Sequence, residues 1–494
     1  MDVSAEQLIA LLILLPLLAA AAAFLWPRLG GGITLFATVV LLAAALHLAA
    51  QVLQSGTITH RVGGWDAPLG IHLRADGLAA FMLVVFTVVA LPVSYYARGY
   101  FSLRAHTGAS PSHFFWPLWL FLLASLNAMA LSADIFNLYV TLELMGLAAV
   151  ALVALAGDAP ALKAAMRYLL VSLAGSLFFL MGVALLYAAY ATVDLTLLAE
   201  RIAPEPVAWT ALALMTGGLM AKGALFPLHF WLPPAHAGAP APVSAALSAL
   251  VVKGAFYILL RLWFEAFGGV TTALAAQLLG VLGTAAILWG SVQALVQVRL
   301  KLLIAYSTVA QLGYLFLLFP LTAGAAGAAT VWTGTMVFLL SHATAKAAMF
   351  LAAGNLLLTA GHDRIKELGG AAHTLPVSVF AIGLAGISLV GLPPSSGFIG
   401  KWLLLGASLE QGQWWWAIVI LAGSLLAAAY LMRVLIPAFT RDPEFKPVVH
   451  VPRGMEWTAF ALALLSLTLG FFATWPADLI AVGAAASAGA GGAP

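Results

Sequence analysis

The 494-residue chain contains no cysteine. Disulfide bonds, thiol chemistry and cysteine-ligated zinc or iron–sulfur sites are therefore excluded. Charged residues are also scarce, at 8% of the chain, against about 25% in soluble domains. A net charge of +3 from so few residues gives no indication of nucleic-acid binding. Hydrophobic residues make up 63%, with a mean hydropathy of +1.05, so the composition predicts an integral membrane protein.

Apolar windows of about 20 residues predict fourteen membrane-spanning helices. They lie near residues 6–26, 31–54, 77–97, 114–132, 134–156, 164–191, 210–227, 241–264, 272–296, 301–320, 329–359, 374–408, 414–438 and 456–475. The first span follows Asp2 and Glu6 without a basic region, and a second span follows it directly. We therefore expect a retained helix rather than a cleaved signal peptide.

Three segments are expected to lie outside these spans. Residues 55–76 alternate apolar and polar side chains around Gly-Gly, which predicts a small extramembrane hairpin. Residues 194–209 are short and amphipathic, so we expect them to lie along the membrane interface. Residues 481–494, the low-complexity stretch AVGAAASAGAGGAP, are expected to be disordered.

The basic residues in the loops predict the orientation of the chain, because Lys and Arg concentrate on the cytoplasmic side. Loops after odd-numbered spans hold Arg28, Arg98, Arg104, Lys163, Arg167, Arg299, Lys301, Arg364, Lys366, Arg433, Arg441, Lys446 and Arg453. Loops after even-numbered spans, or the span ends beside them, hold only Arg61, Arg74, Arg201 and Arg261. The odd loops should be cytoplasmic, which places both termini on the outer side of the cell (inner) membrane.

Four basic residues remain inside predicted spans, and they are all lysines: Lys222, Lys253, Lys346 and Lys401. Glu143 is the one acidic residue that lies clearly within a span. A charge at the bilayer centre costs about 2.5 to 3.5 kcal/mol on insertion scales, so five such residues point to a function. Buried lysines near a carboxylate exchange protons readily when that partner moves. The set predicts a proton relay through trapped water.

Structural alternatives exist for several of these charges. Lys253 lies eight residues before Arg261, about 12 Å along a helix, and a long lysine side chain can reach that same surface. Lys401 follows a Pro-Pro break and can be placed at an interface. Glu143 and Lys222 can form a buried ion pair without any role in transport.

The histidines also have two interpretations. His342 and Lys346 are four residues apart and share one helical face. His342 alone would more often be a packing residue, but the neighbouring lysine favours a role in the relay. His229 and His236 lie near a predicted helix break, where they either provide proton access or merely line a loop or interface. A zinc site is not expected without further ligands.

Two proline-rich stretches predict helices that are broken inside the membrane. The first contains Pro227, Pro233, Pro234, Pro240 and Pro242. Each proline inside a helix would cost about 3 kcal/mol, so these five cannot lie in one unbroken helix. The second stretch, residues 391–401, repeats the Leu-Pro-Pro of residues 232–234 at 392–394. Paired broken helices are typical of transporters built from inverted repeats.

The residues around the first break resemble a known family. Residues 221–261, AKGALFPLHFWLPPAHAGAPAPVSAALSALVVKGAFYILLR, are similar to the seventh and eighth helices of antiporter-like membrane subunits. These subunits are shared by respiratory complex I, membrane-bound hydrogenases and Mrp-type cation/proton antiporters. Supporting stretches are FNLYVTLELMGL, KLLIAYSTVAQLGYLF, LSHATAKAAMFLAAGNL and GLPPSSGFIGKWLLL.

The resemblance implies an all-α membrane protein with about fourteen transmembrane helices, two inverted five-helix repeats and discontinuous helices 7 and 12. Its implied parts are residues 1–113 with helices 1–3 and the hairpin, 114–267 with helices 4–8, 268–440 with helices 9–13, and 441–494 with helix 14 and the tail. It also implies other membrane subunits of a hetero-oligomeric complex as partners. The sequence shows no recognisable electron-carrying ligands, so neither a cofactor nor a metal is expected in this chain.

Carried over by motif, Glu143 would pair with Lys222, and Lys253 would be the lysine of helix 8. His342 and Lys346 match positions of helix 11, and Lys401 matches the last residue of the path in helix 12. The resemblance implies that opening of the Glu143–Lys222 pair drives a proton through Lys253 toward Lys346 and Lys401.

Within the family, the features look most like the D subunit of an Mrp-type Na+/H+ antiporter, which would exchange protons for Na+ or another monovalent cation. One complex I paralogue carries glutamate where this chain has Lys401, which argues against that type. The alternative is a proton-pumping subunit of a redox-driven complex, such as NADH-quinone oxidoreductase or a membrane-bound hydrogenase. A stand-alone permease for an organic solute is disfavoured because the interior polar groups are titratable.

Overall fold

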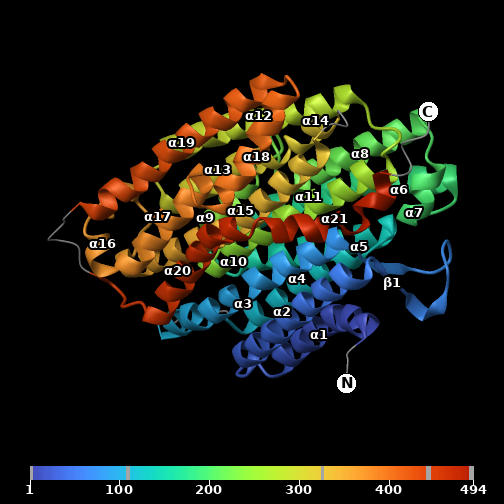
Figure 1. Cartoon of the computed structure of the whole chain (residues 1–494). Coiled ribbons are helices and arrows are strands. Elements are labelled where there is room, and N and C mark those ends of the chain that lie inside the picture. Colours follow the sequence, from blue (N-terminus) through green and yellow to red (C-terminus); the bar gives the residue numbers. More distant parts are fainter. Residues whose placement is uncertain (1–3, 107–111, 324–326, 441–446, 489–494) are drawn as a thin grey trace.

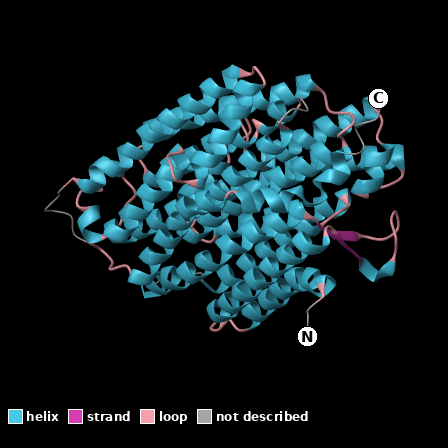
Figure 2. Ribbon diagram, in the orientation of Figure 1, coloured by secondary structure: helices cyan, strands magenta, loops and turns pink. Residues whose placement is uncertain are grey.

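The computed structural model describes residues 4–106, 112–323, 327–440 and 447–488. Nearly all of this chain is helical, and the only sheet in the described part has two strands (Figure 2). The N-terminal part comprises α1 (Ala5–Leu25), α2 (Gly30–Ser55), β1 (Ile58–Arg61), the 3-10 turn η1 (Val62–Gly64), β2 (His72–Ala75) and α3 (Gly77–His106).

A first set of helices follows in the order of the chain. It comprises α4 (Ser112–Leu131), α5 (Ile135–Ala154), α6 (Ala159–Tyr190), α7 (Leu195–Arg201), α8 (Pro206–Lys222), α9 (Leu232–Gly238), α10 (Ala241–Ala246), the π-helical turn η2 (Leu247–Val251), α11 (Val252–Arg261) and the π-helical turn η3 (Leu262–Ala266). Helices α10 to η3 form one continuous crossing, and α7 is a short helix between two crossings.

A second set and a C-terminal part complete the described chain. The second set comprises α12 (Ala273–Val296), α13 (Leu300–Leu315), α14 (Leu318–Thr322), α15 (Ala328–Ala360), η4 (Ile365–Glu367), α16 (Ala371–Thr374), α17 (Pro376–Val390), α18 (Ser396–Glu410) and α19 (Trp414–Phe439). The C-terminal part comprises α20 (Arg453–Thr468), η5 (Leu469–Phe472) and α21 (Thr474–Ala488).

Within the described ranges, 12 helices are long and apolar enough to cross a membrane. Two more crossings are broken helices, one made of α8 with α9 and the other of α17 with α18. Together with the 12 they make the fourteen crossings that the sequence predicts. Each set contains five crossings, which is an odd number, so the second set begins on the opposite side of the membrane and the two five-helix repeats are inverted.

The two breaks form where the prolines predict them. Helix α8 ends at Lys222, and α9 begins at Leu232 with proline in its first turn, the helical position that tolerates proline. Helix α17 ends before Gly391, whose φ of +86° favours glycine. The Ser395 hydroxyl then caps α18 by accepting a hydrogen bond from the Phe398 N–H.

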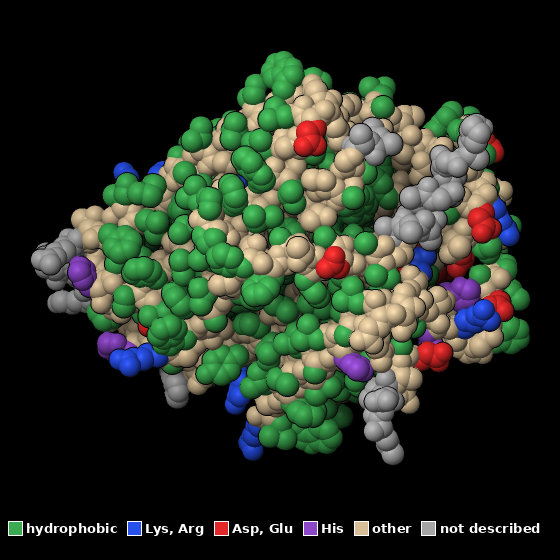
Figure 3. All heavy atoms as spheres, viewed as in Figure 1, with side chains coloured by type: hydrophobic (Ala, Val, Ile, Leu, Met, Phe, Trp, Pro, Cys, Tyr) green, Lys and Arg blue, Asp and Glu red, His purple; other side chains and the backbone are tan. Residues whose placement is uncertain are grey.

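The helices lie side by side, and their two ends differ in character (Figure 1). We call the end that carries the β1–β2 hairpin and α7 the hairpin end, and the opposite end, which carries α16 and the pairing of Arg299 with Arg364, the loop end. Figure 3 shows that apolar side chains cover most of the visible face and that charged side chains gather mainly near the two ends. A membrane-spanning surface has this distribution.

Two crossings form the centre of the molecule. In α10–η3 and in α15, every residue of the most apolar 18-residue window is buried. The outer helices α1 and α6 bury only 39% of theirs. Side chains on the two central crossings therefore face protein on every side, and this applies to Lys253 and Lys346.

The prediction for the C-terminal tail is wrong up to Ala488. Helix α21 extends through this stretch, with non-helical backbone only at Val482 and Gly483. It packs against α2, α3 and α15 and lies on the visible face in Figure 1. The carbonyl oxygen of Leu479 lies so close to Gly77 that no side chain would fit there. Residues 489–494 lie outside the described residues, as does the loop with Arg441 and Lys446.

Candidate proton-transfer site

Glu143 and Lys222 form an ion pair at the first helix break. The Lys222 Nζ lies 2.9 Å from Glu143 Oε1 and also donates to the carbonyl oxygen of Leu142 at 3.2 Å. The Lys222 side chain is 2% exposed and that of Glu143 is 18% exposed. Because Lys222 is the last residue of α8, its ammonium group sits where the helix stops and backbone carbonyls are available.

Three glycines make room for this pair. A Cβ atom on Gly146 would lie 3.2 Å from Lys222 Nζ and 2.7 Å from the Ser172 hydroxyl oxygen. Gly175 of α6 and Gly218 of α8 touch backbone to backbone, since a Cβ on Gly218 would lie 2.2 Å from the carbonyl oxygen of Gly175. Helices α6 and α8 can therefore approach closely and hold Lys222 between them and α5.

Lys253 is fully buried, so the alternative in which it reaches the surface beside Arg261 is wrong. It follows the π-helical turn η2, and its Nζ donates to the carbonyl oxygen of Ser248 within that turn. Such turns insert an extra residue into a helix and are frequent at functional sites. A Cβ on Gly223, the residue after Lys222, would lie 3.6 Å from the Cβ of Ala255, so the first break packs against α11, the helix that carries Lys253.

Polar contacts link Lys253 to Lys346 across the two repeats. The hydroxyls of Ser248 and Thr308 are 2.9 Å apart. Thr308 also donates to the carbonyl oxygen of Ile304, which accepts a second hydrogen bond from Lys346 Nζ at 3.1 Å. Lys346 is fully buried, and no carboxylate is hydrogen-bonded to it in the described chain.

We call Lys222, Lys253, Lys346 and Lys401 the lysine row, and His342 lies among the last three of them. It is fully buried, and both ring nitrogens lack a hydrogen-bond partner among the described residues. The charges of Lys253, Lys346 and Lys401 all act on this ring. An imidazole can accept a proton at one nitrogen and release another from the second, provided that water reaches it.

Lys401 is 4% exposed, so the alternative that places it at an interface is wrong. Its Nζ donates to the carbonyl oxygens of Leu389 and Val390 at the end of α17, and to the Ser424 hydroxyl at 3.1 Å. The Tyr314 ring lies beneath the ammonium group, 4.3 Å from its centroid to Nζ. Carbonyls and an aromatic face thus stabilise this lysine where a carboxylate stabilises Lys222.

His229 and His236 are both buried, at 8% and 0% exposure. His229 lies in the non-helical segment between α8 and α9, so the loop interpretation fits it, whereas His236 lies on α9 itself. His229 Nδ1 and both nitrogens of His236 have no hydrogen-bond partner in the described part of the chain. The His236 ring stacks on Phe350, with 4.5 Å between the ring centroids.

Sequence reasoning missed several buried charges because they lie at helix ends. The sequence pattern places Lys301 with the loop residues, but it is 3% exposed and donates to the carbonyl oxygen of Ala239. Glu456 in α20 is more deeply buried than Glu143: it is 7% exposed and accepts hydrogen bonds from the N–H and hydroxyl of Ser378. A helix-end residue carries no periodic signal that separates a buried position from an exposed one.

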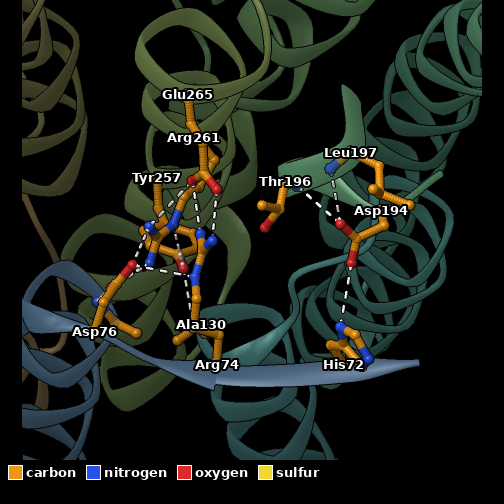
Figure 4. Close-up of polar contacts among 11 residues, drawn as sticks. His72, Arg74, Asp76, Ala130, Asp194, Thr196, Leu197, Tyr257, Arg261 and Glu265 are labelled. Atoms are coloured by element: carbon orange, nitrogen blue, oxygen red, sulfur yellow. Dashed lines mark hydrogen bonds and ion pairs between the residues drawn. The ribbon is translucent and has the colours of Figure 1, made fainter. Parts of the chain in front are cut away.

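A second ion-pair network closes the hairpin end, as Figure 4 shows. Arg261 binds both carboxylate oxygens of Asp76, at 2.5 and 2.6 Å, and Arg74 binds Glu265 at 2.6 Å. Burial by itself raises the pKa of the Asp76 carboxyl, but the charges of Arg261 and Arg74 outweigh burial and hold that pKa at about 2. The network fixes the hairpin end of the crossing that carries Lys253.

A separate contact joins the hairpin to α7. His72 Nδ1 lies 3.4 Å from the Asp194 carboxylate, which also accepts from the N–H groups of Thr196 and Leu197 (Figure 4). Among the described residues, no group of three or more His, Asp or Glu side chains could hold a metal ion.

Comparison with known proteins shows the family of this chain. The sequence profile described as "NADH:quinone oxidoreductase/Mrp antiporter, TM" matches residues 132–427. NADH-quinone oxidoreductase subunit N of Desulforudis audaxviator is 37% identical over 458 residues, which is 90% of this chain and 89% of that protein. The D subunit of the Na(+)/H(+) antiporter of Alkalihalophilus pseudofirmus is 30% identical, covering 82% of this chain and 80% of that protein.

A solved structure of the Mrp complex from a Dietzia species contains a chain with the same fold. The TM-score is 0.88 at 26% sequence identity, covering 98% of this chain and 97% of the other. The profile match spans more than half of the sequence and includes both helix breaks and all the lysines of the row. The chain is therefore a multi-pass membrane protein of the NADH:quinone oxidoreductase/Mrp antiporter transmembrane family.

Proposed function

We propose that this chain is the proton-translocating subunit of a multisubunit monovalent cation/proton antiporter. The observation that carries the proposal is the 2.9 Å ion pair between Glu143 and Lys222 at the break between α8 and α9. An ion pair at the end of an interrupted helix can open with little rearrangement of the helices around it. The similarity to the D subunit of an Na(+)/H(+) antiporter and to a chain of an Mrp complex supports this function.

The pair acts as a switch in this mechanism. While Glu143 is in contact, it stabilises the charged form of Lys222. If Glu143 moves away, the charged Lys222 is left without a carboxylate. Because Lys222 is only 3% exposed, an unpaired charge there is energetically unfavourable. The proton then leaves through water for Lys253, which lies beyond the contact between Gly223 and Ala255.

From Lys253 the proposed path runs to Lys346 and Lys401, with His342 among the three. The contact between the hydroxyls of Ser248 and Thr308 joins the segments whose carbonyl oxygens, those of Ser248 and Ile304, accept hydrogen bonds from the first two lysines. Lys401 is the last station, because its carbonyl and hydroxyl partners lie at the second helix break. His229 and His236 provide access from the loop end in this scheme.

The orientation of the chain is also part of the proposal. The basic residues predict that the loop end faces the cytoplasm and that the hairpin end faces outward. Both termini then lie outside, because fourteen crossings return the chain to its starting side. The partners are the other membrane subunits of a hetero-oligomeric complex, as in the multisubunit Mrp complex to which this fold is similar.

A second candidate is a proton-pumping subunit of a redox-driven complex. It is favoured by the 37% identity to an NADH-quinone oxidoreductase subunit N over 90% of this chain. The ion pair and lysine row would work in the same way, but the driving force would come from electron transfer in another subunit. Co-purification and identification of the partner subunits separates the two candidates.

The experiment that tests the switch compares Glu143→Gln with the wild-type chain in vesicles that contain the complete complex. Glutamine keeps the shape of the side chain but not its charge. We expect proton-coupled transport to fall on the order of a hundredfold, with an unchanged amount of complex in the membrane. Transport at the wild-type rate would contradict the proposed function.

A further inference from the structure

We propose that Lys301 is the entry station for protons at the loop end, and that it passes them to His236. This inference rests on the proposed function and adds a residue to its path. Lys301 is the second residue of α13, close to the loop end of the bundle, yet it is only 3% exposed. Its Nζ donates to the carbonyl oxygen of Ala239, the residue that ends α9.

The surroundings of Lys301 connect it to the surface of the loop end. The charges of Asp363, Arg299 and Arg104 act on its ammonium group. Asp363 is hydrogen-bonded to Arg299 through both carboxylate oxygens at 2.9 Å, and the side chain of Arg299 is 48% exposed. The one acid that faces Lys301 is thus held by an arginine that reaches solvent, so Lys301 has no carboxylate of its own.

His236 lies on the inward side of Lys301. Among the charges that act on the His236 ring, that of Lys301 is the strongest, followed by Lys346 and Lys253. Both ring nitrogens are buried and have no hydrogen-bond partner within the described ranges. A fully buried imidazole with two free nitrogens needs water or proton exchange to satisfy them.

Phe350 places His236 beside the helix that carries Lys346. The His236 ring stacks on Phe350, and Phe350 lies four residues after Lys346 on the same face of α15. On one side His236 therefore contacts α15 one helical turn from Lys346, and on the other it lies three residues before Ala239, whose carbonyl oxygen accepts from Lys301. In the described chain, no titratable side chain acts on the ring besides the three lysines.

The proposed steps conserve protons and charge. A neutral Lys301 amine takes a proton from water at the loop end and becomes ammonium. It gives this proton through water to one nitrogen of His236 and returns to the neutral amine. His236 releases the proton from its other nitrogen toward Lys346. Repulsion between these cations favours one proton at a time in the cluster. A second proton that arrives therefore destabilises the first and promotes its transfer to the next residue.

The competing explanation is structural, because a cation near the end of a helix stabilises its last carbonyls. Lys301→Arg separates the two explanations. Arginine keeps the positive charge and can donate to the Ala239 carbonyl oxygen, but it does not release its proton. Lys301→Gln removes both properties. Lys366→Arg, at an exposed lysine of the same end, is the matched control.

The variants are tested in vesicles containing the complete complex, by the rate of proton uptake from the loop-end side. We expect Lys301→Arg and Lys301→Gln to lower this rate on the order of a hundredfold, while Lys366→Arg leaves it unchanged. The amount of assembled complex is measured for each variant. Lys301→Arg with the wild-type rate overturns the proposal, since Lys301 would then serve only to bond the end of α9.

His236→Gln tests the proton transfer from Lys301 to His236 without changing the contact between Lys301 and Ala239. If a Lys301 variant fails to assemble, this variant still tests the proposal. We expect the same loss of proton uptake, and a wild-type rate overturns the proposal. Glu143→Gln is measured in parallel. If only Glu143→Gln is impaired, the entry station is wrong and the proposed function stands. If Glu143→Gln is also normal, the proposed function itself fails.

Discussion

The hydroxyl of Ser248 lies 2.9 Å from the hydroxyl of Thr308, and this contact joins the two inverted repeats beside the lysine row. Ser248 belongs to the π-helical turn that holds Lys253, and Thr308 shares the carbonyl oxygen of Ile304 with Lys346. Both hydroxyls are fully buried. One pair of small polar side chains therefore joins the two segments that accept hydrogen bonds from Lys253 and Lys346.

We expect Ser248→Ala and Thr308→Val each to lower the free energy of unfolding by about 1 kcal/mol, because each removes the buried contact between the two hydroxyls. In the double variant the losses should not add. Thr87→Val is the matched control, since the buried Thr87 hydroxyl bonds to carbonyl oxygens of its own helix. Thermal unfolding of the purified protein measures the stability of the single, double and control variants. Simple additivity of Ser248→Ala with Thr308→Val would show that the contact does not couple the repeats.

We expect Gly218→Ala to impair both stability and transport. The added Cβ would lie 2.2 Å from the carbonyl oxygen of Gly175, so α6 and α8 must move apart and displace Lys222 from Glu143. The cost should be about 1 to 3 kcal/mol, as for other overpacked sites. Gly217→Ala is the control one residue away, where a Cβ meets nothing within 4 Å. It should be neutral or stabilising by about 0.5 to 1 kcal/mol. Equal behaviour of the two variants in thermal unfolding would refute the close approach.

The Asp76–Arg261 pair predicts a pH dependence of stability. The pKa of Asp76 is about 2 in the folded chain against an ordinary value of 3.8. Since folding lowers this pKa, the stabilisation is complete above about pH 4 and is lost as the pH falls toward about 2. The loss should amount to about 2 kcal/mol.

Asp76→Asn tests this pH dependence, because asparagine has no carboxyl group that takes up a proton. Between about pH 5 and pH 2, the free energy of unfolding should fall by about 2 kcal/mol less in this variant than in the wild-type chain. Asp66→Asn is the control, because the Asp66–Arg61 pair is exposed at 66% and 58% and contributes little. The same pH dependence in Asp76→Asn and wild type would mean that Arg261 does not shift the carboxyl.

Asp194 should determine the stability of the short helix α7. Its carboxylate caps the helix by accepting from the N–H groups of Thr196 and Leu197 at 2.9 and 3.0 Å. Asp194→Ala should cost about 1 kcal/mol and speed hydrogen exchange in residues 195–201. Asp194→Asn keeps a capping oxygen and should retain most of the protection. Equal exchange in the alanine and asparagine variants would argue that the contact with His72, rather than the cap, holds α7.

Much of the fold could be predicted from the sequence. Long apolar runs identified the crossings, and the two Leu-Pro-Pro stretches identified the two broken helices, because proline cannot continue a helix. The lysine row could also be predicted, since a lysine inside an apolar span cannot be assigned to a loop. The hairpin pairs Ile58–Arg61 with His72–Ala75, as its alternating pattern predicts.

Other features depended on contacts between distant segments. Arg261 and Asp76 are 185 residues apart, and nothing local to either residue indicates the other. The sequence places Lys301 in a loop because helix ends have no periodic pattern, and only the packing of α13 against α9 buries it. Helix α21 forms in a stretch of low complexity because α2, α3 and α15 supply the surface against which it packs.

The sequence by itself determined that this chain crosses a membrane many times, that two crossings are broken, and that a row of titratable side chains lies in its interior. These conclusions follow from local chemistry, since hydrocarbon excludes charge and proline interrupts helices wherever they occur. Only the tertiary structure decided which charges meet: Glu143 with Lys222, Asp76 with Arg261, and Lys301 with the end of α9. The energy of a buried charge depends on what lies within a few ångströms of it, and that is set by packing between helices far apart in the chain.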